Sequence, residues 1–340
     1  MTNRVTLRQF GLNEAISDSL GPLLTADREA GRVVRVDRGE VDVVCEDRES
    51  PLRCSMTTAA KDCVAGDWVA VNGAECRVEA VLPRRTAFVR RAARGATTAQ
   101  TLAANMDVVL VVQAFDPGVN LRRLERELVL AHQSGATPVV VITKSDRVDE
   151  ATLQRTVAET QLVAPGVRVV CVSNVTLQGF DDLREIVKIG VTFALLGSSG
   201  VGKSTLVNSL AGETVQLEGE IRTGDGKGRH TTTAARLIRL ADGRLLLDTP
   251  GVRALALWEA WEGLAETFSE IESVTSECQF SDCFHDHEPG CAVLARLEAG
   301  SISRERLESW RRLRDEMAEL DDLLEAQARK RERTGRAPRN

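Results

Sequence analysis

The stretch Gly197-Ser198-Ser199-Gly200-Val201-Gly202-Lys203-Ser204 has the spacing G-x-x-x-x-G-K-S of a phosphate-binding loop. Residues 191–196 before it are mainly apolar and predict a buried parallel strand, and residues 205–210 after it carry apolar side chains at helical spacing. A strand, a glycine loop and a helix N-terminus together direct backbone N–H groups at a phosphate. The sequence therefore predicts a phosphate site in an α/β domain. The alternative is a glycine-rich turn that matches the motif by chance.

The side chains of this loop have separate expected roles. Lys203 is placed to reach the β- and γ-phosphates and to act in catalysis, and the Ser204 hydroxyl is placed to bind Mg²⁺. The expected nucleotide contacts in this segment are Gly197, Ser198, Ser199, Gly200, Val201, Gly202, Lys203, Ser204 and Thr205.

Residues that would select the base lie upstream of the phosphate loop. Guanine presents a ring N–H and an exocyclic amine that a carboxylate can accept, whereas adenine has no such donor pair on that edge. Residues 139–142 predict a buried strand, and Thr143-Lys144-Ser145-Asp146 follows it as T-K-x-D. Asp146 is the expected guanine ligand, and the aliphatic stem of Lys144 would cover the base. Taken alone, the pattern is equally consistent with a strand followed by a polar turn.

Three more segments support a GTPase. Ser173-Asn174 follows the strand at 169–172 and is suited to supporting the base. The strand at 245–247 ends in Asp248-Thr249-Pro250-Gly251, a D-x-x-G motif in which Asp248 holds Mg²⁺ through water and the Gly251 N–H touches the γ-phosphate. The polar segment 228–233 lies between the phosphate loop and D-x-x-G, and its Thr232 is the expected switch threonine for Mg²⁺.

Along the chain, the two base-recognition segments (143–146 and 173–174) come first, and the phosphate loop (197–204) follows them. After it come switch one (228–233) and switch two, the D-x-x-G motif at 248–251. A GTPase normally carries its base-recognition elements after its phosphate loop. The sequence therefore predicts a circularly permuted P-loop GTPase.

The position that follows D-x-x-G is Val252, whereas many GTPases have a glutamine there to orient the attacking water. An apolar side chain makes no hydrogen bond to water, so another group must do this. His230, in the segment 228–233, is the candidate because an imidazole hydrogen-bonds water at neutral pH. The alternative is that His230 contacts only RNA or solvent.

These motifs in this order resemble the ribosome small-subunit-dependent GTPase A (RsgA) family, over nearly the whole chain. The most diagnostic strings are Gly228-Arg229-His230-Thr231-Thr232-Thr233 and a cysteine cluster after the GTPase core. The resemblance implies an enzyme that converts GTP to GDP and phosphate, is stimulated by the small ribosomal subunit, and assists late maturation of that subunit. One departure is Thr143, where the family usually has Asn; it alters one hydrogen bond that braces the base pocket and retains Asp146.

The cysteine cluster has the spacing C-x₄-C-x-H-x₅-C. Three thiolates and one imidazole suit a closed tetrahedral zinc site of the structural kind. His287 lies nearby, and the resemblance selects His285 as the histidine ligand. The alternative is a set of unrelated thiols beside a His-rich loop. The expected ligands of one structural zinc ion are Cys278, Cys283, His285 and Cys291.

The chain is expected to be multidomain. Short strands between residues 31 and 88, broken by glycines, predict a small closed β-barrel. The resemblance makes this barrel an OB-fold, and a purely structural barrel is the alternative. The expected division is an N-terminal extension at 1–30, the OB-fold barrel at 31–90, a linker at 91–104, the permuted α/β GTPase domain at 105–256, an α-helical zinc-binding domain at 257–328 and a basic tail at 329–340.

A net charge of −6 means that contact with rRNA has to be local. Basic residues gather at 84–94, where a solvated linker is an equal alternative, and in the tail at 329–336, where an RNA contact is favoured. No signal peptide or long apolar run is apparent, so we expect a cytoplasmic monomer without membrane association.

Two other functions are compatible with parts of the sequence. One is a P-loop ATPase or kinase, which a strong preference for ATP would favour. The other is an RNA-binding module with a purely structural nucleotide site, which a complete absence of hydrolysis would favour.

Overall fold

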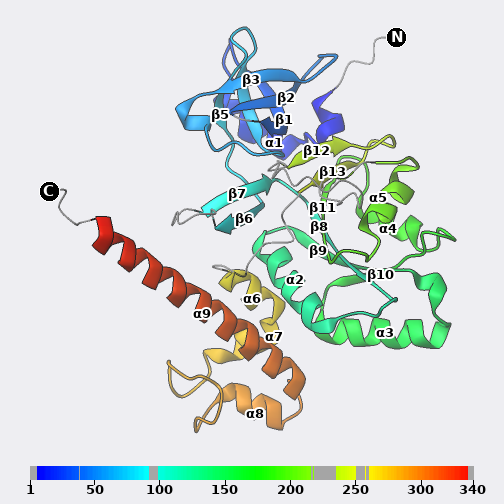
Figure 1. Cartoon of the computed structure of the whole chain (residues 1–340), viewed down its shortest axis with the longest axis vertical. Helices are drawn as coiled ribbons and strands as arrows, with labels where there is room; N and C mark the ends of the chain where they lie inside the picture. Colours follow the sequence, from blue (N-terminus) through cyan, green and yellow to red (C-terminus); the bar gives the residue numbers. More distant parts are fainter. Residues whose placement is uncertain are drawn as a thin grey trace.

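The computed structural model describes residues 6–37, 39–91, 99–215, 217, 235–249, 257 and 260–335. Figure 1 shows a β-barrel near the N-terminus, a central sheet flanked by helices, and a helical C-terminal part. The helix α9 (Arg304–Gly335) begins in this C-terminal part and projects away from the rest of the molecule. Among the described residues, no helix is both long and apolar enough to cross a lipid bilayer.

Five strands close into the predicted barrel, in the order β1-β2-β3-β5-β4 with β4 returning to β1. Side chains that alternate along the strands, such as Val41, Val43, Val69 and Val71, fill its interior, because successive residues of a strand face opposite sides. The short elements η1 (Leu7–Phe10), α1 (Glu14–Leu20) and η2 (Gly21–Leu23) precede the barrel. Its strands are β1 (Glu29–Asp37), β2 (Glu40–Cys45), β3 (Leu52–Met56), β4 (Trp68–Asn72) and β5 (Arg77–Val81), with η3 (Thr58–Ala60) before β4.

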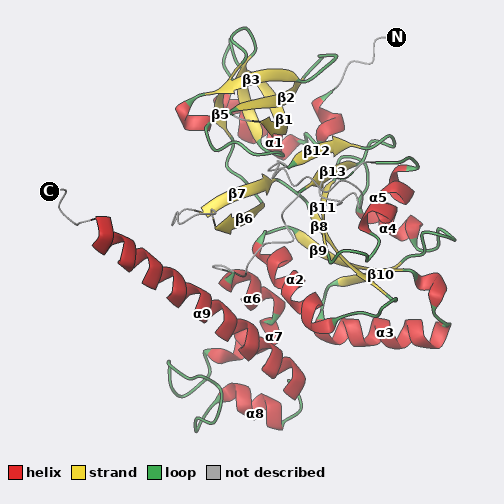
Figure 2. Cartoon of the chain, viewed as in Figure 1, coloured by secondary structure: helices red, strands yellow, loops and turns green. Residues whose placement is uncertain are grey.

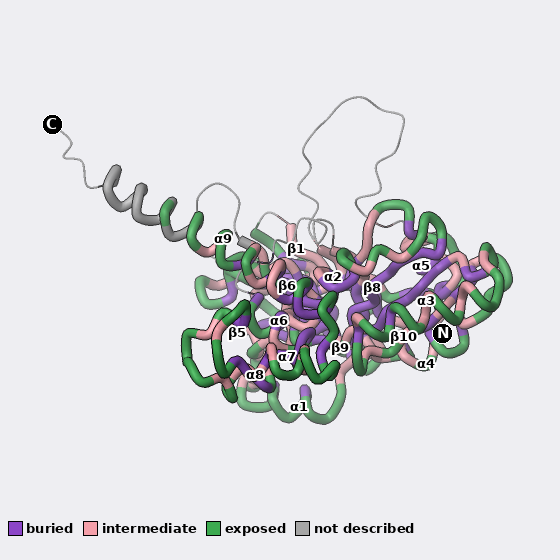
Figure 3. The backbone as a smooth tube through the Cα atoms, turned by 90° about the horizontal axis from the view of Figure 1, so that it is seen from below, coloured by how far each residue is buried: buried purple, intermediate pink, exposed green. Residues whose placement is uncertain are grey.

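The central sheet contains five parallel strands in the order β10-β9-β8-β11-β13, and β12 is antiparallel to β13. Figure 2 shows helices beside these strands, and Figure 3 shows that much of the central sheet is buried. The strands are β8 (Val108–Ala114), β9 (Thr137–Thr143), β10 (Arg168–Cys171), β11 (Thr192–Leu196), β12 (Arg236–Arg239) and β13 (Leu245–Asp248). The helices are α2 (Leu121–Gln133), α3 (Glu150–Val163), α4 (Phe180–Ile186) and α5 (Lys203–Ala211), with the short η4 (Ser145–Arg147) after β9.

The two faces of the sheet carry separate hydrophobic cores. Val109 and Val111 of β8 belong to the same core as Leu124 of α2, whereas Leu110 of β8 belongs to the core that contains Leu206 of α5. This division follows from the two-residue period of a strand. It accounts for the nearly continuous apolar runs in the sequence, because a parallel strand covered on both faces needs apolar residues at every position.

The chain reverses its direction across the sheet next to β8. From β8 it proceeds to β9 and then β10 on one side, and it then returns to β11 on the other side. In open α/β sheets, ligands bind at the carboxyl ends of the strands beside such a reversal. The fold therefore places the candidate site between the loops that follow β8 and β11.

The barrel and the central sheet are hydrogen-bonded to each other. Strand β1 pairs with β12, with Arg35 opposite Arg236, so that the barrel strands continue the central sheet. Strands β12 and β13 form a hairpin around Asp242-Gly243.

The predicted linker at 91–104 includes a strand. Strand β7 (Ala99–Ala104) pairs with β6 (Ala87–Arg91) as a two-stranded antiparallel sheet. Phe88 and Ala103 lie opposite each other and are both buried. This pairing depends on contacts between two segments, which the local composition of either segment does not reveal.

The C-terminal part packs around the first half of α9. Ser303 caps this helix, since its Oγ accepts a hydrogen bond of 3.2 Å from the Arg306 N–H. One side of α9 is buried in the core, at Leu307, Trp310, Leu313 and Met317. The other helices are α6 (Trp261–Thr267), α7 (Ser269–Thr275) and α8 (Ala292–Glu298), and the backbone of α9 is helical to Gly335, within the predicted tail.

One buried arginine joins the C-terminal part to the GTPase domain. The guanidinium of Arg306 in α9 donates to Glu125 Oε1 of α2 at 3.1 Å, to Glu270 Oε1 of α7 at 2.7 Å and to the Val163 carbonyl at the end of α3 at 3.0 Å. It also lies 4.0 Å from the centre of the Phe268 ring. Arg306 therefore ties α9 to two helices of the GTPase domain.

Candidate nucleotide-binding site

The loops that follow the parallel strands meet at one edge of the sheet. They bring together Lys144 after β9, Ser173 after β10, the phosphate loop after β11 and Asp248 at the end of β13. This arrangement joins predicted pieces that are about one hundred residues apart in the sequence. His230, Thr232 and Gly251 lie outside the described residues, as does Val252.

The phosphate loop has a backbone that requires glycine. Gly197 has φ of +139°, and a Cβ there would lie 2.4 Å from the Val112 carbonyl oxygen. The loop leads directly into α5, which begins at Lys203. The Lys203 ammonium donates to the carbonyls of Gly197 (2.8 Å) and Ser198 (2.6 Å), so it lies against the loop that would hold the phosphates.

Thr143 connects the base-recognition strand to the phosphate loop. Its side chain is fully buried at the end of β9, and Oγ1 lies 2.5 Å from the Val201 carbonyl oxygen and 3.2 Å from that of Gln113. The hydroxyl thus braces the phosphate loop against β8 and β9. Gln113 was not identified from the sequence.

Asp146 is held in a defined orientation. Its Oδ1 accepts a hydrogen bond of 2.6 Å from the Ser173 hydroxyl, and Ser173 Oγ in turn accepts from the backbone N–H groups of Val175 and Thr176, each at 3.1 Å. Because an ionised carboxylate accepts several hydrogen bonds, its other lone pairs can still serve a base. The structure thus brings together Asp146 and Ser173, as expected.

Lys144 lies beside a residue that the sequence analysis did not identify. It has left-handed backbone geometry (φ +62°), and its Nζ donates to the Asp116 carbonyl at 2.7 Å. The Asp116 carboxylate pairs with Arg147. The available signal was an acidic residue just beyond the strand at 108–114, which resembles Asp146 in its position after a strand.

Oxygen ligands suitable for Mg²⁺ lie at the same edge. Ser204 is in the first turn of α5, and Asp248 ends β13, which is parallel to β11 and adjacent to it. A hydroxyl and a carboxylate are the hard oxygen donors that this ion prefers. The residues present therefore fit a magnesium–nucleotide complex.

Glu127 of α2 is a further ionisable group of this region that the sequence analysis missed. It is 8% exposed, and its Oε2 accepts a hydrogen bond of 2.7 Å from Gln113 Nε2. Burial raises the pKa of the Glu127 carboxyl to about 7, while the charges of Arg123 and Lys203 act in the opposite direction. The carboxyl therefore titrates near neutral pH within the field of the phosphate-loop lysine.

The predicted zinc ligands form one cluster. Ligand atoms of Cys278, Cys283, His285 and Cys291 all lie within 4.8 Å of one another. His285 Nδ1 is 3.4 Å from Cys278 Sγ and 3.5 Å from Cys291 Sγ, and these two sulfurs are 3.9 Å apart. Tetrahedral zinc with its usual bond lengths separates two sulfurs by about 3.8 Å and a sulfur from a nitrogen by about 3.5 Å. The donor set and its spacing therefore fit zinc.

The choice between the two neighbouring histidines agrees with the resemblance. His285 is 6% exposed and contacts the Trp310 ring edge-on, with ring centres 5.6 Å apart. The side chain of His287 is 86% exposed and pairs with Asp286. His285 is thus the histidine that belongs to the cluster.

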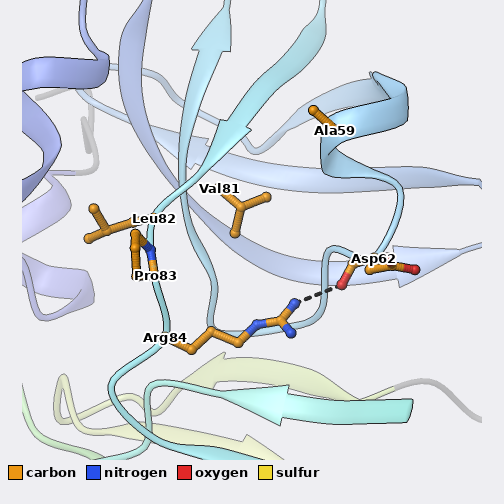
Figure 4. A pocket seen from close by; sticks show the side chains of 6 residues that line it. All are labelled: Ala59, Asp62, Val81, Leu82, Pro83 and Arg84. Atoms are coloured by element: carbon orange, nitrogen blue, oxygen red, sulfur yellow. Dashed lines mark hydrogen bonds between the residues drawn. The ribbon is translucent and has the colours of Figure 1, made fainter. Parts of the chain in front are cut away.

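Three of the arginines at 84–94 have partners within the protein. The guanidinium of Arg84 donates to both carboxylate oxygens of Asp67, at 2.8 and 2.9 Å, and to the Asp62 carbonyl at 2.7 Å. It lines a cavity of about 270 Å³ beside Val81 and Pro83 (Figure 4). Because Asp67 is fully buried, Arg84 neutralises an interior charge and is not free to bind RNA.

The other two described arginines of this cluster lie at the surface. Arg85 pairs with Asp107, and Arg90 donates to Gln100. The Arg91 side chain and Arg94 lie outside the described residues.

A parallel sheet with a G-x-x-x-x-G-K-S loop, a braced T-K-x-D aspartate upstream of that loop and D-x-x-G downstream defines a circularly permuted P-loop GTPase. The chain belongs to the RsgA GTPase family, whose model matches residues 81–258. It is therefore a GTP hydrolase.

Relatives match nearly the whole chain. The small ribosomal subunit biogenesis GTPase RsgA of Streptomyces coelicolor is 42% identical over 342 residues, covering 96% of this chain and 91% of the relative. The protein of the same name from Methanosarcina acetivorans is 42% identical and covers 78% of this chain and 72% of the relative.

Solved structures have the same fold. The YjeQ protein of Thermotoga maritima matches with a TM-score of 0.64 at 27% identity, covering 86% of this chain and 99% of that one. YloQ, described as a circularly permuted GTPase, matches with a TM-score of 0.63 at 22% identity, covering 93% of this chain and 98% of that one.

Proposed function

We propose that this GTPase binds the small ribosomal subunit and its rRNA, assists late maturation of the subunit, and hydrolyses GTP faster when bound to it. The observation that carries the proposal is the 42% identity, over 96% of this chain, to a small ribosomal subunit biogenesis GTPase. Action on ribosomal subunits would place the protein in the cytoplasm.

The test is GTP turnover by the full-length protein with and without purified small subunits, with ATP as the competing substrate. Slow turnover of GTP alone, marked stimulation by small subunits and no comparable use of ATP would support the proposal. No stimulation by small subunits would contradict it. A preference for ATP would favour the kinase or ATPase alternative.

The described residues support separate roles in nucleotide binding. Asp146, held by Ser173, is proposed to accept from the ring N–H and exocyclic amine of guanine. Lys203, at the start of α5, is proposed to bind the β- and γ-phosphates and to neutralise the charge that develops on the transferred group. Ser204 is proposed to bind Mg²⁺ directly and Asp248 to hold it through water, and the ion would polarise the phosphates.

The residues outside the described part complete the proposed site. Thr232 is proposed to join Ser204 as a Mg²⁺ ligand, and the Gly251 N–H to contact the γ-phosphate. Both would respond to the presence of the γ-phosphate, because each contact is lost when that phosphate leaves.

His230 is proposed to orient the attacking water. We expect His230→Ala to reduce subunit-stimulated turnover by about 10²-fold, the usual scale for a group that positions or accepts a proton, with little change in GTP affinity or subunit binding. Single-turnover kinetics with saturating subunits measures this effect. His287→Ala, which changes an exposed histidine, is the matched control. Full stimulated turnover by His230→Ala would mean that the ribosome or backbone groups orient the attacking water.

The cysteine–histidine cluster is proposed to hold one structural zinc ion. Because the free energy of metal binding in a closed site contributes to folding, Cys283→Ala is expected to lose stoichiometric zinc and to destabilise residues 278–291, with nucleotide binding largely intact. Metal analysis and thermal unfolding measure the two effects. Cys171→Ala, which changes a thiol outside the cluster, should retain the metal. Absence of zinc from the native protein would disprove the site.

The barrel is proposed to be an OB-fold that contacts rRNA. Its strand order supports this proposal, since a five-stranded barrel of this kind commonly carries a nucleic-acid surface. The basic residues beyond 328 are proposed to contact phosphates, because local positive charge is needed in a chain with a net charge of −6.

A further inference from the structure

Two polar side chains lie against Gly202, the last glycine of the phosphate loop. A Cβ built on Gly202 would lie 3.5 Å from Thr143 Oγ1 and 3.8 Å from Asn174 Nδ2. Thr143 is the last residue of β9, three positions before Asp146, and Asn174 lies in the loop after β10, next to Ser173. The Asn174 amide therefore lies between the base-recognition loops and the phosphate loop.

Of these two side chains, the amide is the one that a ligand can engage. The Thr143 hydroxyl has a single hydrogen, and both of its contacts are to backbone carbonyls, of Val201 and Gln113. Asn174 Oδ1 is enclosed and has no hydrogen-bond partner among the described residues. The N–H groups of the same amide, beside Gly202, likewise make no hydrogen bond to a described residue, so they are available to donate to a ligand.

The chemistry of guanine offers a partner for this amide. Asp146 can accept from the donor edge of the base, but a carboxylate cannot serve the opposite edge, where N7 and O6 are both acceptors. An amide N–H can donate there. Asn174 follows Ser173, which orients Asp146, so one short loop can support both edges of the base.

We propose that the side-chain amide of Asn174 donates a hydrogen bond through Nδ2 to N7 of the bound guanine. The proposal rests on the guanine-nucleotide site described above. It assigns base recognition to two side chains, Asp146 for the donor edge and Asn174 for the acceptor edge, while Thr143 keeps the phosphate loop in place.

The test compares GDP with 7-deaza-GDP, in which a C–H group replaces N7, by titration calorimetry on the full-length protein. We expect the unmodified protein to bind 7-deaza-GDP about 3- to 10-fold more weakly than GDP, the scale of one neutral hydrogen bond. Asn174→Ala is expected to bind GDP more weakly by a similar factor and to bind both nucleotides equally well. Val175→Ala, which changes the exposed neighbouring side chain, should discriminate as the unmodified protein does.

Equal affinity of the unmodified protein for the two nucleotides would overturn the inference, as would full discrimination by Asn174→Ala. In either case, tight and Asp146-dependent binding of GDP would leave the proposed GTPase function standing. Failure of the unmodified protein to bind GDP at all would overturn that function as well.

Discussion

Asp146→Asn is expected to weaken guanine-nucleotide binding by about 10²- to 10⁴-fold and to shift the preference of the site toward xanthine nucleotides. The carboxylate would lose two charge-assisted hydrogen bonds, each worth about 1.5–3 kcal/mol. The Ser173 hydroxyl, at 2.6 Å from Oδ1, would hold the new side chain in the same place, so the change would be one of chemistry and not of position. Xanthine has a carbonyl where guanine has its exocyclic amine, and that carbonyl can accept from the new amide.

Titration of GDP and of xanthosine diphosphate into both proteins measures this change in preference. Asp149→Asn is the matched control, because Asp149 is only three residues away and caps α3 through its side chain. Asparagine is an equally good cap, so this variant should bind GDP normally. An unchanged affinity of Asp146→Asn for GDP would show that Asp146 does not bind the base.

Arg306→Ala is expected to destabilise the protein by about 3–5 kcal/mol, the usual cost of removing one member of a buried ion pair, because the remaining partner of Glu125 is the more exposed Arg312 at 3.5 Å. Glu125 is 2% exposed, and its Oε1 accepts from Arg306. The variant would also lose the contact with the Phe268 ring and the hydrogen bond to Glu270. Because the bonds to Glu125 of α2 and to the Val163 carbonyl of α3 cross to the GTPase domain, we expect the C-terminal part to separate from that domain before the latter unfolds.

Urea unfolding followed by tryptophan fluorescence measures the loss, since Trp310 lies on α9. Arg304→Ala, which changes an exposed arginine of the same helix, should alter stability by no more than about 0.5 kcal/mol. The double variant Arg306→Leu with Glu125→Leu should recover part of the loss, because the fully buried Glu125 carboxylate is removed together with its partner, while the more exposed Glu270 still loses its hydrogen bond. Equal stability of Arg306→Ala and Arg304→Ala would show that the ion pair contributes nothing to the interface.

The sequence could predict the pieces of the site because their chemistry is local. The phosphate loop needs glycines at fixed spacing before a lysine and a hydroxyl, and at Gly197 a Cβ would collide with the Val112 carbonyl oxygen. The T-K-x-D string follows a strand, and the structure adds that Ser173, predicted to support the base, orients its aspartate. The cysteine spacing likewise predicted a cluster whose interatomic distances suit zinc.

Other features depend on partners that are distant in the sequence, and only the tertiary structure decided them. Arg84 lies in a basic segment for which RNA contact and a solvated linker were equal alternatives, and folding places it against the buried carboxylate of Asp67. The sequence predicted Thr143 at the base pocket, and only the structure shows that its hydroxyl contacts the Val201 carbonyl, fifty-eight positions away.

The sequence by itself thus determined the class of enzyme and the order of its motifs, since each motif is a short continuous stretch of residues. The tertiary structure decided which side chains neutralise, brace or remain available to a ligand, as it did for Arg84, Thr143 and Asn174. The physical reason is that a buried polar group needs a hydrogen-bond or charge partner inside the fold. The packing of strands and helices determines which residue becomes that partner, and nearness along the chain does not.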